Sequence, residues 1–285
     1  FAAGGPTDAV ARLVAEAMGK DLGQSLIVEN VGGAGGTLGA ARVAQARPDG
    51  YSLLLHHIGM ATTPTLYRRL PYDPVGFETI GLITAAPMTV VVRKDHPAKT
   101  FQELVAWIKD KKEDANLGNA GLGAASQLCG TLLQYLLQTP MTTVPFRGTG
   151  PAMTELLAGR IDVMCDQTTN TVEHIKTGGI RVLAVTTPER LAVLPDVPTT
   201  AELGMPDLQV SIWHGLYAPK GTPAEVVERA SAALRVALKD EKVVARFAEL
   251  GLTPEPAQRA TPAAHRAFWI SEIAKWRPVL QARSE

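Results

Sequence analysis

The sequence carries no excess of charge of either sign. Lysine and arginine together number 28, aspartate and glutamate also number 28, and the formal net charge is +0. Proteins that bind nucleic acid through its phosphates present a basic surface, and this composition indicates none. No apolar run approaches the ~18 residues that a membrane-spanning helix requires. We therefore expect a soluble protein whose partner is a small molecule and not a nucleic acid.

Cysteine is scarce, with only Cys129 and Cys165 in the whole chain. Neither has a second cysteine or a histidine at the spacing of a metal site, so no metal centre is predicted. Two alternatives remain open for the pair. They are either two buried thiols or one disulfide, and a disulfide would indicate an oxidising compartment.

Catalytic motifs are also missing. The chain has no G-x-S-x-G sequence, no H-E-x-x-H sequence and no phosphate-binding loop that ends in Gly-Lys-Ser/Thr. Gly33-Ala34-Gly35 resembles the start of a dinucleotide-binding fingerprint, but the third glycine, Gly39, comes one residue too late. We therefore predict neither an enzyme nor a cofactor. An NAD-dependent oxidoreductase that uses the Gly33-Ala34-Gly35 loop stays as a weak alternative.

What the sequence does contain is a regular alternation of strand and helix patterns. Short apolar runs predict strands at 26–28, 51–55, 88–92, 142–146, 161–165, 180–185 and 210–218, and helical periodicity lies between most of them. Such alternation is typical of α/β proteins with mostly parallel sheets flanked by helices.

The C-terminal part is predicted to be helical, at 223–238, 241–250 and 262–282. These helices have no strands nearby and must cover the sheet formed early in the chain. We therefore expect one lobe from residues 1–97 and 221–285 and a second lobe from 98–220. Two crossover segments, near 93–100 and 217–222, would join them and make a hinged cleft.

Three glycine-rich loops precede predicted helices, at 3–8, 32–37 and 119–126. The start of a helix directs backbone N–H groups outward and favours an anion. Each loop is either such an anion site or a tight turn that needs glycine.

Two further positions are candidates for a binding site. His56 and His57 end a strand, and their side chains leave it on opposite faces, so one of them could line a cleft. Asp166 follows the strand at 161–165, and ligands of open α/β sheets bind at the carboxyl ends of strands. The alternatives are a packing histidine and a carboxylate that caps its own loop.

A series of motifs along the chain is similar to one known family. The chain resembles the tripartite tricarboxylate transporter receptors, the TctC or Bug family of periplasmic solute-binding proteins. The resemblance covers nearly the whole chain and rests on FAAGGPTD at 1–8, VEN at 28–30, GAGG at 33–36, ARPDGY at 46–51, LPYDP at 70–74, VPFRG at 144–148, LAVTT at 183–187, LPDVPT at 194–199, APKGTP at 218–223 and a late Trp276.

This resemblance implies a two-lobed type II periplasmic-binding-protein fold, the Venus-flytrap fold, with two crossover strands. It also implies an extracytoplasmic, non-enzymatic protein that captures a small organic acid and delivers it to the membrane permease of the transporter. We expect the protein to be periplasmic and monomeric. A signal peptide, and a first strand as well, are expected to precede residue 1.

The family holds its ligand carboxylate mainly through backbone groups and waters of two loops. Residue by residue, this implies binding roles for Phe1, Ala3, Gly4, Thr7 and Asp8 in the first loop and for Leu122, Gly123, Ala124 and Ser126 in the third. The cleft position implies roles for His57, Ala61, Thr62, Phe146 and Asp166, and the loop at 32–37 is expected to be structural. Gln127 and Thr63-Pro64 depart from the family pattern, so the sequence does not identify the acid.

Overall fold

The computed structural model describes residues 1–281. Within them, none of the helices is both long enough and apolar enough to cross a membrane. In chain order the helices and strands are α1 (Pro6–Leu22), α2 (Thr37–Ala44), β1 (Leu54–His57), α3 (Gly59–Leu66), β2 (Phe77–Arg93), α4 (Phe101–Lys111), β3 (Asn116–Asn119), α5 (Ala125–Leu137), β4 (Thr142–Pro145), α6 (Thr149–Leu157), β5 (Val163–Gln167), α7 (Thr168–Lys176), β6 (Ile180–Val185), β7 (Ser211–Pro219), α8 (Ala224–Ala237), α9 (Glu241–Glu249), β8 (Thr253–Pro254) and α10 (Pro262–Gln281).

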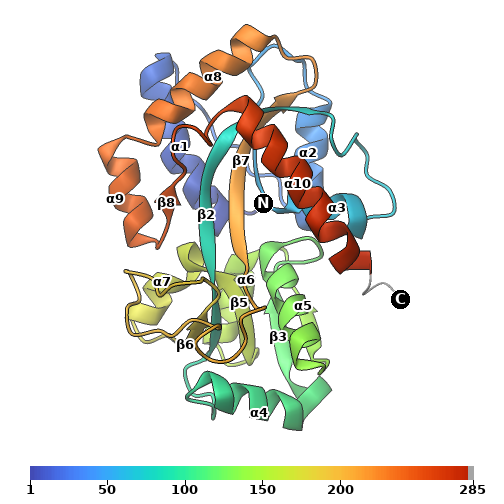
Figure 1. Cartoon of the computed structure of the whole chain (residues 1–285), viewed down its shortest axis with the longest axis vertical. Coiled ribbons are helices and arrows are strands. Elements are labelled where there is room, and N and C mark those ends of the chain that lie inside the picture. The colour runs from blue at the N-terminus through green and yellow to red at the C-terminus, as the bar shows by residue number, and fades with distance from the viewer. Residues whose placement is uncertain (282–285) are drawn as a thin grey trace.

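Strand β2 belongs to both lobes of the molecule (Figure 1). Its first part, up to Pro87, pairs with β7 and β8 in the upper lobe, and β7 pairs in turn with β1. From Met88 onward, β2 pairs with β5 and β6 in the lower lobe. The crossover segments predicted near 93–100 and 217–222 are therefore wrong. The chain changes lobe at Pro87/Met88 and enters β7 at Ser211.

The sheets are mixed, but the expected predominance of parallel strands is wrong. Among the strands of residues 1–281, only the pairs β3–β4 and β3–β5 are parallel, and β1, β2, β7 and β8 pair antiparallel with one another. The reason is that β2 and β7 run in opposite directions side by side. The strand predicted at 26–28 is also wrong, because this segment pairs with no strand of the described chain and the Ile27 side chain is 85% exposed.

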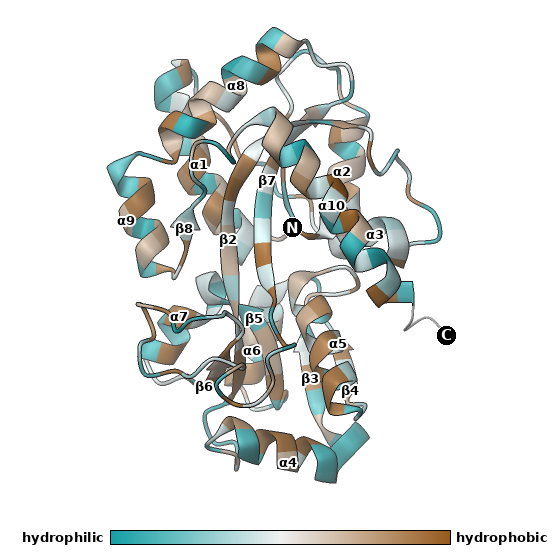
Figure 2. Cartoon of the chain, in the orientation of Figure 1, coloured by the Kyte–Doolittle hydropathy of each residue, from teal (hydrophilic) through white to brown (hydrophobic). Residues whose placement is uncertain are grey.

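The C-terminal helices cover the upper sheet, as predicted. Helices α8 and α10 both pack on β2, and α10 also packs on α3 (Figure 1). These helices carry hydrophobic and hydrophilic residues together (Figure 2), and their buried side chains, among them Leu234 and Trp269, join the main core. Burial of such side chains is the main stabilising contribution to the fold.

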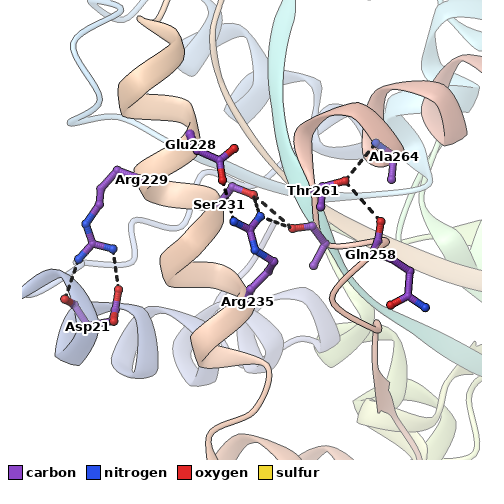
Figure 3. Close-up of polar contacts among 9 residues, drawn as sticks. Asp21, Glu228, Arg229, Ser231, Arg235, Gln258, Thr261 and Ala264 are labelled. Carbon is purple, nitrogen blue, oxygen red and sulfur yellow. Dashed lines mark hydrogen bonds and ion pairs between the residues drawn. The ribbon is translucent and has the colours of Figure 1, made fainter.

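Polar contacts fix helix α8 to its neighbours (Figure 3). The Arg229 guanidinium donates to the carboxylate of Asp21 at 2.6 Å and to its carbonyl at 2.8 Å, which ties α8 to the C-terminal end of α1. Arg235 donates to the Ser231 hydroxyl and to the Ala260 carbonyl, which ties α8 to the segment before α10. Helix α1 is thus held at its C-terminal end, far from the lobe boundary.

The two cysteines are both buried free thiols, so the disulfide alternative is not what the structure contains. Cys129 lies on α5 and Cys165 on β5, where the helix packs on the strand. A hydrogen bond with the Cys165 thiol, together with burial, raises the pKa of Cys129 well above its ordinary value. Both side chains are part of the lower core.

Candidate ligand-binding site

A small cavity lies where the two lobes meet, with about 410 Å³ of empty space, part of it open to solvent. The N-terminal segment and His57 line it from the upper lobe, and the starts of three helices line it from the lower lobe. The full lining set is Phe1, Ala2, Gly5, Pro6, Thr7, His57, Ala120, Ala124, Ala125, Ser126, Gly148, Thr149, Gly150, Asp166 and Gln167.

Four helices begin at this cavity. Each contributes the residue just before its first turn to the cavity wall: Gly5 for α1, Ala124 for α5, Gly148 for α6 and Gln167 for α7. None of these four residues caps its helix with a side-chain hydrogen bond. The first-turn N–H groups therefore keep their capacity to bind an anion, and the helix dipoles favour negative charge at this position. No lysine or arginine is among the lining residues.

The first loop is held in place by Asp8, which does not line the cavity. The Asp8 carboxylate accepts hydrogen bonds from the Gly4 N–H at 2.8 Å, the Arg12 guanidinium at 3.0 Å and the Asn30 amide at 2.9 Å. Burial would raise the pKa of Asp8, but these partners hold it below its ordinary value. Asp8 thus fixes the loop as an ionised group, and Pro6 starts α1 at a position that needs no N–H donor.

Three buried histidines lie behind and beside the first loop. The His57 ring is 4.4 Å from the Phe1 ring and 5.9 Å from the His214 ring, measured between centroids. Burial lowers the pKa of His56 to about 4, that of His214 to about 3 and that of His57 well below its ordinary value, so all three are neutral near pH 7. The His57 Nδ1 atom accepts from the Gly59 N–H at 2.9 Å, which leaves its proton on Nε2.

The lower wall carries an unusual carboxylate. Asp166 is 0% exposed, and its oxygens accept from the Gln167 N–H at 2.9 Å and from the Asn170 amide at 2.6 Å. Burial raises its pKa to about 7, although the hydrogen bonds from the Asn170 amide and the Gln167 N–H oppose this shift. Beside it, the Gln167 Oε1 atom is buried and has no hydrogen-bond partner within residues 1–281.

The structure brings together six of the residues predicted for the site: Phe1, Thr7, His57, Ala124, Ser126 and Asp166. The other predicted residues are not on the wall. Ala3 and Gly4 are exposed, Ala61 and Thr62 are buried in α3, Leu122 is 47% exposed, Phe146 packs against a side cluster of the core, and Asp8 and Gly123 lie behind the wall residues.

Sequence reasoning missed the start of α6 at 148–150 and the side chain of Gln167. Gly148, Thr149 and Gly150 line the cavity and are followed by Pro151, the same signal of glycines and proline that marked the first loop. Gln167 is the last residue of β5 and is not among the residues predicted for the site. His214 was missed because only the β1–β7 register, which sets His57 opposite His214, brings it near the site.

The middle glycine loop does not line the cavity. A Cβ atom at Gly35 would lie 2.1 Å from the Leu122 carbonyl oxygen, and one at Gly36 would lie 2.4 Å from the His56 Nε2 atom. Both residues have positive φ, of 60° and 89°. Glycine is therefore needed here so that this loop can contact the loop at 119–126 and the His56 ring.

Comparison with known proteins identifies the family. The model of the tripartite tricarboxylate transporter family receptor matches residues 10–284. The chain belongs to this family. A relative from Agrobacterium vitis, the UPF0065 protein in the TAR-I ttuE-ttuC' intergenic region, is 54% identical over 280 residues, which cover 98% of this chain and 81% of the relative.

Solved structures of the receptor family agree with the fold. The periplasmic binding protein BugD is 45% identical with a TM-score of 0.96, and the match covers 99% of this chain and 94% of BugD. MatC from Rhodopseudomonas palustris, solved with bound malate, is 41% identical with a TM-score of 0.94, covering 98% and 96% of the two chains. The two-lobed periplasmic-binding fold is thus confirmed, and the protein is a solute-binding receptor of a transport family and not an enzyme.

Proposed function

We propose that this protein captures a small organic acid in the cavity between its lobes, with the ligand carboxylate held at the four uncapped helix starts. The observation that carries the proposal is the convergence of α1, α5, α6 and α7 on one cavity that has no cationic side chain. The malate bound to MatC, a receptor of the same fold, supports a carboxylate as the ligand class.

The energetics of this arrangement suit reversible capture. A partly buried helix N-terminus stabilises an anion by up to ~2 kcal/mol, so several of them together favour a bound carboxylate without a cationic side chain. The Ser126 hydroxyl accepts from the Ala120 N–H at 2.9 Å, which leaves its own proton free to donate to a ligand. Release needs no chemistry, because separation of the lobes returns water to the carboxylate.

We also propose that the two lobes close by bending where the chain passes between them, at Pro87/Met88 within β2 and just before Ser211, the first residue of β7. The protein would work as a periplasmic monomer and present its closed form to the membrane permease of the transporter. The family assignment as a transporter receptor supports this role.

Calorimetric titration with mono- and dicarboxylates, aromatic acids, amino acids and NAD tests the proposal. We expect one class of acid to bind and NAD not to bind. A ligand at 100 times its Kd adds about 2.7 kcal/mol of stability, which a thermal-shift measurement detects. Absence of binding by every acid would refute the capture of a carboxylate.

A substitution at Gly150 tests the location of the site. A Cβ atom at Gly150 meets no atom within 4 Å, so a side chain fits there. Gly150→Asp places a carboxylate in the first turn of α6 and is expected to weaken binding of the acid at least tenfold. Gly150→Asn has the same size without the charge and serves as the matched control. Equal affinities of the two variants would contradict the assigned site.

A further inference from the structure

The hydrogen bonds of His214 have only one consistent direction. Its Nδ1 atom is 3.2 Å from the Ile212 carbonyl oxygen, which can only accept, so Nδ1 carries a proton. The ring is completely buried and neutral, so Nε2 has no proton. The Thr7 hydroxyl, 3.2 Å from Nε2, must therefore donate its proton to His214.

This direction determines what Thr7 offers to a ligand. A threonine hydroxyl has one proton and two lone pairs, and the proton of Thr7 is already used. Thr7 lines the cavity and is 7% exposed. It therefore presents lone pairs to the cavity, which repel a carboxylate oxygen and attract a hydrogen-bond donor.

The opposite wall independently shows the same preference. Asp166 and Gln167 both line the cavity, and the Oε1 atom of Gln167, a residue that is 3% exposed, has no hydrogen-bond partner within residues 1–281. A buried acceptor without a donor destabilises the complex that contains it. A ligand with only carboxylates would leave the Gln167 Oε1 atom and the Thr7 lone pairs without a donor.

We propose that the ligand carries a hydrogen-bond donor, a hydroxyl or an ammonium group, on the carbon next to its bound carboxylate, and that Thr7, oriented by His214, recognises this donor together with Asp166 and Gln167. The inference rests on the proposed function, because it concerns a second group of the same ligand. Thr7 lies in the first turn of α1, beside the N–H groups assigned to the carboxylate, so the two groups of the ligand must be adjacent. Thr7 would be a specificity-determining residue and His214 a positioning residue.

Matched acids test this inference with the purified full chain. Succinate, malate and aspartate differ only in having hydrogen, hydroxyl or ammonium at the second carbon, and analogous sets exist for three-, five- and six-carbon acids. At the length that binds, we expect the hydroxy or the amino acid to bind at least tenfold more tightly than the unsubstituted acid. The stronger of the two identifies the donor. Equal affinity for the unsubstituted acid overturns the inference but leaves acid capture intact, whereas no binding in any set refutes both.

Variants of the two residues separate recognition from structure. The quantity to compare is the affinity for the hydroxy or amino acid divided by the affinity for the unsubstituted acid. Thr7→Ser keeps the hydroxyl and is expected to keep this ratio. Thr7→Val removes the hydroxyl and is expected to lower the ratio at least fivefold. His214→Phe keeps a ring but releases the Thr7 proton, so the unsubstituted acid should bind more tightly and the ratio should fall. A purely structural role of His214 would weaken all acids alike. An unchanged ratio in folded Thr7→Val and His214→Phe proteins overturns the assignment.

Discussion

The helices that begin at the cavity differ from two that begin elsewhere. Helix α4 starts with Thr100, whose hydroxyl accepts from the Glu103 N–H at 3.2 Å, and α9 starts with Asp240, whose carboxylate accepts from the Lys242 N–H at 2.9 Å. The cavity helices start with glycine, alanine or glutamine and have no such bond. A side-chain cap contributes about 1 kcal/mol, so the cavity helices lack this stabilisation, and under the proposed function their N–H groups bind the ligand instead.

The largest expected effect concerns the two buried aspartates of the site region, whose pKa values shift in opposite directions. Asp166 has a raised pKa of about 7, so its contribution to stability is greatest below pH 4 and is lost as the pH rises through 7. In the unmodified protein, the unfolding free energy should therefore fall by a few kcal/mol between pH 4 and 7, and in Asp166→Asn this fall should be absent. Urea denaturation at several pH values measures it. Asp8→Asn is the contrasting variant, because Asp8 has a lowered pKa and stabilises the fold only above its ordinary range.

A capping side chain added at the cavity should raise the stability of the protein and weaken its binding of the acid. Ala124 has extended backbone angles, φ −73° and ψ 154°, which suit a capping residue. We expect Ala124→Ser to raise the unfolding free energy of the ligand-free protein by roughly 0.5–2 kcal/mol and to weaken acid binding several-fold. Thermal unfolding and calorimetric titration of the same sample test both parts. A gain in stability with unchanged affinity would show that the α5 N–H groups do not hold the ligand.

A cap removed away from the cavity should affect stability alone. Asp240→Ala deletes the acceptor for the Lys242 and Val243 N–H groups, and we expect a loss of about 1 kcal/mol. Affinity for the acid should stay within experimental error, because α9 does not line the cavity. Thr100→Ala in the lower lobe is the parallel control. If either variant lowers the affinity, the contrast between capped and uncapped helices does not separate stability from function.

The smallest effect is expected at the contact between α8 and α1. The ion pair of Arg229 and Asp21 is partly solvent-exposed, so Arg229→Met should lower the unfolding free energy by less than ~1 kcal/mol and lose most of this effect in high salt. Chemical denaturation at low and high ionic strength measures it. A larger loss, insensitive to salt, would mean that this contact orients α1 toward the cavity.

Sequence reasoning succeeded where the signal is local. The glycines of the first and third loops, together with Pro6 in the first, mark the starts of α1 and α5, and both starts line the cavity. It failed where strand pairing decides the outcome. The strand predicted at 88–92 covers only the end of β2, which also runs through Gly81 and Pro87, two residues that are unfavourable inside strands. The place of His214 depends on a register that no local pattern encodes. The state of the cysteines also depends on packing, and the structure has buried thiols.

The continuity of β2 has a consequence for how the protein unfolds. The sheet of the lower lobe includes the pairs Val90–Cys165 and Val92–Val163, and their β2 members precede residue 98. A fragment of residues 98–220 would therefore lack β2, the strand that joins β5 to β6. The remaining segments would lack β7, the strand that joins β1 to β2. The two lobes consequently share one cooperative unit, and the whole chain should melt in a single calorimetric transition.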